Sequence, residues 1–177
     1  MSNVREVGIP VGSNISLYSK GVDLMDAYMV RLPKGSITSP ELLAKFIFEQ
    51  QAYWVMGLMR LRDMFVKMFR LKVSTVEDFI STDKHGAERI GFFKVYSLID
   101  NEIIMGEDDH HLDFRISVLY REGEFGGEKS PHIIISTVVL CHNRLGRNYL
   151  RLIKPFHRVI VKSGLRRAVV NGFPKQK

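Results

Sequence analysis

Residue types that could transfer protons are concentrated in one short segment of the chain. His111, Asp113 and Arg115 alternate along the sequence, and alternate side chains of a β-strand share one face. A carboxylate that orients an imidazole can make it a general base, so His111 is a candidate base and Asp113 its orienting residue. His157 is a second candidate acid or base. The simpler interpretation is structural: Asp113 forms an ion pair with Arg115 or with a neighbouring strand.

The spacing of these residues does not favour a metal or a cofactor. Imidazole and carboxylate groups can bind zinc, but the adjacent His110 and His111 would point to opposite sides of one strand, and no HExxH motif is present. Cys141 is the only cysteine, which excludes a disulfide or a thiolate cluster. No GxSxG, GxGxxG or P-loop motif occurs. We therefore expect no metal and no cofactor. The sequence favours a protein without catalytic activity over an enzyme.

Basic residues are concentrated in the C-terminal part of the chain. Residues 129–177 contain 11 Lys and Arg and no Asp or Glu, and the whole chain has a net charge of +7. Many of them follow one another at intervals of three or four, which is the spacing of one helix face. An anionic membrane surface or an acidic protein could dock there, although a solvated helix face is the simpler interpretation. We do not expect nucleic acid, because no nucleic-acid motif is present. The predicted anionic-surface residues are Arg147, Arg151, Lys154, Arg158 and Lys162.

The elements that must position these residues can be predicted from periodicity. Patterns of period two predict strands over 26–32, 92–98, 102–107, 111–120 and 132–142. Asp100-Asn101 predicts a tight hairpin turn, and the polar, glycine-rich segment 121–131 predicts a loop.

Helix signals surround these strands. Ser39-Pro40-Glu41 predicts a helix start, followed by a pair of helices that extends to about residue 71. The final helix should begin between Asn143 and Gly146, run to about residue 168 and kink at Pro155. Its predicted apolar face consists of Tyr149, Leu152, Ile153, Phe156 and Ile160.

The order of these elements predicts the fold class. A helix pair after the first strand, an antiparallel meander and a long C-terminal helix indicate an α+β domain, in which a curved sheet packs on the last helix. Hydrophobic residues make up 45% of the chain and charged residues 25%, as in globular proteins. We expect one domain over 1–177. The N-terminus lacks a signal-peptide core and no apolar run could span a bilayer, so we expect a cytoplasmic protein.

Three segments of the chain resemble a known family. They are GEDDHHLDFRISVL at 106–119, HNRLGRNYLRLIKPFHRVIV at 142–161 and WVMGLMRLRDMFVKMFRL at 54–71. They are similar to an uncharacterised bacterial domain-of-unknown-function family, whose members occur alone or behind an NAD(P)-binding epimerase-like domain. The resemblance covers about residues 21–168. His110 stands where an arginine is more usual, and without the dehydrogenase domain the resemblance implies no nicotinamide cofactor.

The same resemblance implies a fold and a class of ligand. The family is similar to the START-like helix-grip superfamily, whose members mostly hold apolar ligands between the sheet and the C-terminal helix. We therefore expect a small apolar or amphipathic ligand in that cavity. An enzyme using His111 or His157 with Asp113, and an interaction module docking by its basic helix, remain alternatives, and a homodimer is possible. The predicted lining residues are Trp54, Phe114, Tyr149, Phe156 and His157, with Arg60 or Arg115 as polar anchors.

Overall fold

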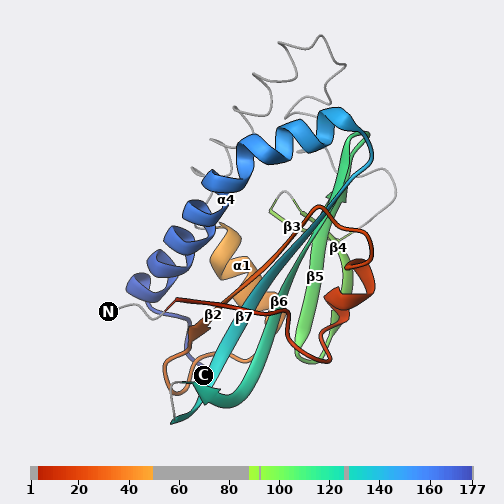
Figure 1. Ribbon diagram of the computed structural model, residues 1–177. Helices are drawn as coiled ribbons and strands as arrows, with labels where there is room; N and C mark the ends of the chain where they lie inside the picture. The colour runs from red at the N-terminus through yellow and green to blue at the C-terminus, as the bar shows by residue number, and fades with distance from the viewer. Residues whose placement is uncertain (1–3, 50–87, 92, 126–127, 177) are drawn as a thin grey trace.

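The fold is α+β, as predicted. The computed structural model describes residues 4–49, 88–91, 93–125 and 128–176, so Trp54, Arg60 and the second predicted helix lie outside the described residues. Seven antiparallel strands form one curved sheet in the order β1-β2-β7-β6-β5-β4-β3 (Figure 1). The strands are β1 (Arg5–Val7), β2 (Leu24–Arg31), β3 (Arg89–Ile90), β4 (Phe93–Ile99), β5 (Glu102–Asp108), β6 (Leu112–Phe125) and β7 (Glu128–Cys141). The described helices are the 3-10 helix η1 (Asn14–Tyr18), α1 (Pro40–Glu49) and α4 (Arg144–Asn171).

The predicted strands and the predicted hairpin turn are present, but the predicted loop over 121–131 is wrong. β6 and β7 pair along their whole length, from Leu112 opposite Cys141 to Phe125 opposite Glu128. A backbone ladder needs no apolar side chains, and this end of the hairpin carries exposed residues such as Glu122 and Lys129. Its polar composition therefore reflects exposure to solvent and not the absence of a strand.

The two faces of the sheet are covered by different parts of the chain. On one face, Tyr28, Ile135 and Val118 lie side by side across three strands and are buried against α1 and α4. The helix α1 begins at Pro40, as predicted, and contributes Leu43 to this core. We call this side the helix-facing side. The opposite side, which we call the outer side, is contacted by η1, whose Ile15 is buried.

The helix α4 begins where the sequence predicts. Asn143 caps it by accepting a hydrogen bond from the backbone N–H of Gly146 at 3.0 Å. The start of the helix approaches the sheet closely, because a Cβ added to Gly146 would lie 2.1 Å from the carbonyl oxygen of His111. Pro155 lies inside the helix, and Figure 1 shows α4 changing direction along its length.

The predicted apolar face of α4 is correct in part. Ile153 is buried and Tyr149 and Ile160 are half-buried, but Phe156 and Leu152 are 53% and 39% exposed. The buried side chains also include Leu150 and Leu165. Apolar residues surround most of the helix between 149 and 161, so periodicity alone allows several orientations. Packing sets the orientation, and the buried residues of α4 include the small Gly146, which lies next to the backbone of His111, and Gly164.

Candidate functional site

The two neighbouring candidates in β6 lie on opposite sides of the sheet. Phe114 is partly buried on the helix-facing side and packs against the core. Arg115 lies on the outer side, as the alternation of strand side chains requires. Arg115 therefore cannot be the polar anchor of a cavity lined by Phe114, and Arg60, the other predicted anchor, lies outside the described residues.

Arg115 is held firmly by aromatic and acidic neighbours. Its guanidinium carbon lies 3.7 Å from the ring centroid of Tyr96 and 5.2 Å from that of Tyr18. One guanidinium nitrogen donates to Asp108 at 2.6 Å, and the other donates to the carbonyl oxygen of Phe114 at 2.9 Å. Burial alone would raise the pKa of Asp108, but the hydrogen bonds from Arg115 and Tyr96 lower that pKa below its usual value. These contacts make Arg115 a structural element of the outer side.

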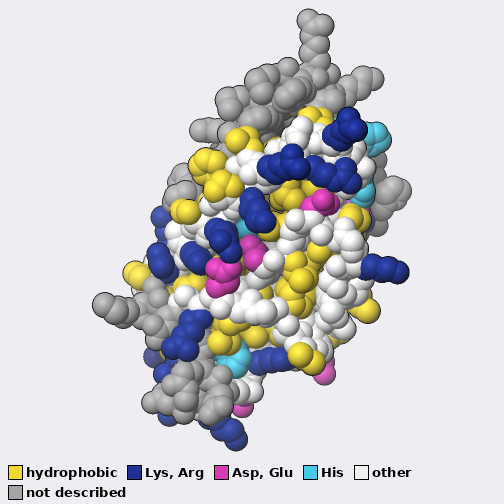
Figure 2. All heavy atoms as spheres, in the orientation of Figure 1, with side chains coloured by type: hydrophobic (Ala, Val, Ile, Leu, Met, Phe, Trp, Pro, Cys, Tyr) yellow, Lys and Arg dark blue, Asp and Glu magenta, His cyan; other side chains and the backbone are white. Residues whose placement is uncertain are grey.

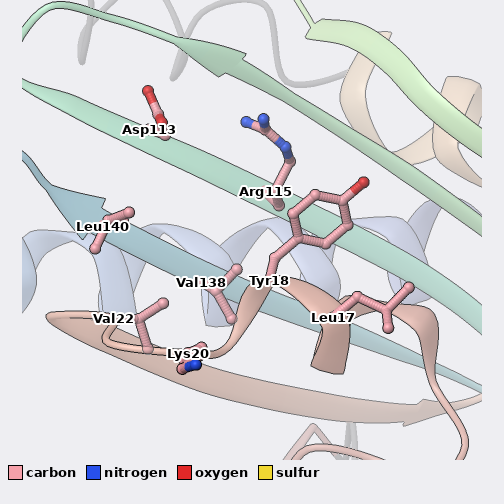
Figure 3. Close-up of a pocket in the computed structure, with 8 residues that line it drawn as sticks. All are labelled: Leu17, Tyr18, Lys20, Val22, Asp113, Arg115, Val138 and Leu140. Atoms are coloured by element: carbon pink, nitrogen blue, oxygen red, sulfur yellow. The ribbon is translucent and has the colours of Figure 1, made fainter.

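A shallow hollow of about 230 Å³ lies beside Arg115 on the outer side (Figure 3). Its walls come from β6, β7 and the segment that includes η1. Asp113 borders it, and one of its carboxylate oxygens lies 2.9 Å from Nε2 of His142. The hollow is lined by Leu17, Tyr18, Lys20, Val22, Asp113, Arg115, Val138 and Leu140.

The predicted pair of His111 with Asp113 does not form. Nδ1 of His111 lies 2.9 Å from the side-chain amide nitrogen of Asn143, the residue that caps α4. Asp113 pairs with His142 instead, and Arg115 pairs with Asp108 on the neighbouring strand. The sequence therefore places the right residue types near one another, but it does not identify which of them pair.

A second histidine–aspartate pair joins α4 to β2. Nε2 of His157 lies 3.2 and 3.3 Å from the two carboxylate oxygens of Asp26. The His157 side chain is 18% exposed and that of Asp26 is 7% exposed. Nδ1 of His157 has no hydrogen-bond partner among the described residues. Asp113, the predicted orienting residue for His157, lies on the other side of the sheet.

Polar groups surround Asp26 on the helix-facing side. The Tyr28 hydroxyl donates to its carboxylate at 3.4 Å, and Thr137, which is buried, is its register partner on β7. Burial, followed by the negative charges of Asp26 and Glu6, raises the pKa of Tyr28 to about 12. We call the set of Asp26, Tyr28, Thr137 and His157 the Asp26 cluster. Asp26 could have been noticed from the sequence, because it is an acid that alternates with apolar residues on one face of a strand.

The Asp26 cluster lies between two apolar contacts of α4 with the rest of the fold. Near the start of α4, Leu150 packs against Leu24 and Val139. Towards its end, Leu165 and Ala168 belong to the main core. His157 lies between these two contacts along the helix, so α4 meets the sheet at two apolar positions with a polar position between them.

The basic residues of α4 divide into paired and unpaired groups. Arg158 and Lys162 contact Glu6, and Arg147 lies 3.4 Å from Asp23. Arg151 and Lys154 are exposed and have no partner among the described residues. Figure 2 shows Lys and Arg side chains following α4, with acidic side chains next to some of them.

The remaining predicted residues add little to a site on the described surface. Tyr149 is half-buried, and Phe156 is 53% exposed. Within the described ranges, no three His, Cys, Asp or Glu side chains are grouped so that they could hold a metal ion. No described helix is long and apolar enough to cross a membrane.

Comparison with known proteins identifies the family. The chain belongs to the family described as "Protein of unknown function (DUF2867)", whose model matches residues 18–164. No curated protein and no solved structure matches the chain. The resemblance to a family of unknown function is thus confirmed, and the function must be argued from the geometry of the site.

Proposed function

We propose that this member of the DUF2867 family binds a small amphipathic ligand between the sheet and α4, and that the Asp26 cluster holds its polar end. The observation that carries the proposal is the contact of 3.2 Å between His157 and Asp26, which lies along α4 between the apolar contacts of Leu150 and of Leu165. The START-like ligand position, between a curved sheet and a C-terminal helix, is the same region of the fold.

The need for stability alone does not explain a histidine–aspartate pair at the contact between α4 and β2. Removing a carboxylate and an imidazole from water costs free energy that their contact only partly returns. Two well-packed apolar side chains would stabilise the contact between α4 and β2 at least as well. The polar pair is therefore better explained by a second molecule that uses it.

The sheet next to the pair supplies an apolar wall. Asp26, Thr137 and Ile116 are successive register partners across β2, β7 and β6, so the row changes from polar to apolar over two strand spacings of roughly 5 Å each. Ile116 and the nearby Phe114 remain partly exposed on the helix-facing side. A ligand with its polar end at His157 would lay its apolar part towards these two side chains.

The hydrogen-bonding capacity of the His157–Asp26 pair defines which polar head group the ligand must carry. When Nε2–H of a neutral His157 donates to Asp26, Nδ1 can accept a hydrogen bond from a hydroxyl group. When His157 is protonated, Nδ1–H can donate to a carboxylate. The proposal therefore specifies a hydroxyl or carboxyl head group on an aliphatic or aromatic body.

Two measurements test the proposal. Native mass spectrometry of the purified protein should reveal a retained small molecule, and calorimetric titration with medium-chain fatty acids and the matching alcohols should give saturable binding. Replacing His157→Leu should weaken binding about tenfold, which corresponds to one charge-assisted hydrogen bond. His142→Leu is the matched control, because it removes the other histidine–aspartate pair, on the outer side, and should leave affinity unchanged. Absence of both a retained molecule and saturable binding would contradict the proposal.

The same pair favours a second candidate function, proton transfer on the bound molecule. A carboxylate that orients an imidazole and leaves Nδ1 available is the arrangement of a general base. In this role Nδ1 of His157 would take a proton from the ligand while Asp26 holds the ring. Incubating the retained molecule with fresh protein and following its mass would test this role, because Asp26→Asn should then stop the chemical change while binding persists.

A further inference from the structure

The middle of α4 presents large apolar side chains to solvent. Leu152, Phe156 and Val159 are 39%, 53% and 62% exposed. Their spacing of four and three residues places them on one line along the helix, on the side away from the buried Leu150 and Leu165. We call these three residues the exposed ridge. Val170, which is 81% exposed, continues the same line towards the end of the helix.

Cations without acidic partners lie beside this ridge. Arg144, Arg151 and Arg166 are exposed, and none has a partner among the described residues. At roughly 100° of rotation per residue, all three lie within about a third of a turn of the ridge. No acidic residue occurs in α4, so nothing on the helix neutralises them.

We propose that α4 docks on an anionic lipid bilayer, with the exposed ridge inserted among the acyl chains and Arg144, Arg151 and Arg166 at the head groups. An apolar line bordered by cations is the pattern of a helix that lies in a membrane interface. Charge complementarity selects the anionic bilayer, because the residues from 129 to the C-terminus contain no acid and the chain carries a net charge of +7. The helix would lie on the bilayer and not cross it, in keeping with its content of basic residues.

This surface differs from the set of five anionic-surface residues predicted from the sequence. Three members of the predicted set, Arg147, Arg158 and Lys162, already contact acidic residues of the same chain. Arg151 belongs to both sets. The ridge and the Asp26 cluster are on different sides of α4, so docking does not depend on the ligand proposed above.

Sedimentation with lipid vesicles tests the proposal. The unmodified full chain should sediment with vesicles containing phosphatidylserine and phosphatidylcholine at low salt, and should not sediment with phosphatidylcholine alone. Raising the salt concentration should weaken binding, because the arginine contacts are screened. Phe156→Ser with Val159→Ser should reduce the partition coefficient at least tenfold, and Arg151→Glu with Arg166→Glu should do the same.

Two controls keep the result interpretable. Leu42→Ser changes a leucine of α1 that is 48% exposed, and it should leave vesicle binding unchanged. Circular dichroism and the denaturation midpoint should show that the ridge variant is folded, since it alters only exposed side chains. Absence of binding by the unmodified chain, equal binding to neutral vesicles, or undiminished binding by the ridge variant would overturn the proposal. Size-exclusion chromatography could instead reveal a dimer that Phe156→Ser with Val159→Ser dissociates, while no vesicle binding is seen. That result would assign the exposed ridge to contact with a second copy of the chain and would also overturn the membrane proposal.

Discussion

The carboxylate of Glu102 in β5 accepts a hydrogen bond from the hydroxyl of Ser13, which lies 89 residues earlier in the chain. Glu102 is 1% exposed, and it also accepts bonds from the Ser117 hydroxyl and, at 2.7 Å, from the backbone N–H of Asn14. These three bonds fasten the start of η1 to the outer side of the sheet.

Removing this carboxylate should destabilise the protein strongly. Glu102→Ala leaves the buried Ser13 and Ser117 hydroxyls without their acceptor, so we expect a loss of about 2–4 kcal/mol in the free energy of unfolding, measured by urea denaturation. Ser16→Ala, which removes a hydrogen bond from an exposed serine to the backbone carbonyl of Ser13, should cost less than about 1 kcal/mol. Equal losses in the two variants would show that Glu102 does not anchor η1.

The orientation of α4 can be tested with two truncations in the same helix. Leu165→Ala removes a side chain that is 1% exposed and should cost about 2–5 kcal/mol. Phe156→Ala removes a larger side chain that is 53% exposed and should change stability by less than about 1 kcal/mol. The reverse order of the two losses would mean that the helix is rotated relative to the arrangement described above.

Asp108 should make stability depend on pH in acid. Its pKa is lower in the folded protein than in the unfolded chain, so its contribution is fully present above the ordinary pKa of about 4 and is lost as the pH falls through the folded value. Denaturation midpoints measured from about pH 5 to pH 2 should fall more steeply for the unmodified protein than for Asp108→Asn. Parallel curves would be inconsistent with the bonds from Arg115 and Tyr96.

Tyr28 should have the opposite effect at alkaline pH. Its pKa is raised to about 12, so its contribution to stability is complete below the ordinary value near 10 and is lost as the pH rises through 12. Ultraviolet titration of tyrosinate should show late ionisation, and Tyr28→Phe should remove one late step together with part of the alkaline loss of stability. Tyr96 also has a raised pKa, so the comparison with Tyr28→Phe is what assigns the step.

Local patterns predicted the elements much better than their contacts. The turn at Asp100-Asn101 and the start of α1 at Pro40 depend on neighbouring residues, and both were found where expected. The partner of His157 could not be found in this way, because Asp26 lies 131 residues away and meets it only through the packing of α4 on β2. The sequence could not decide whether Arg115 or Phe114 faces α4 for a related reason: alternation separates the two side chains, but it does not say which face the helix covers.

The arrangement of the strands also has a consequence for the order in which the chain folds. β4, β5, β6 and β7 are neighbours both in the sequence and in the sheet, so they can pair through short loop closures. β2 must instead pair with β7, where Leu24 lies opposite Val139. The chain between these two residues is long, and closing a long loop is slow. We therefore expect the meander to form first. On the ribosome, β2 would emerge before β7 and remain without this neighbour until β4, β5, β6 and β7 had been synthesised.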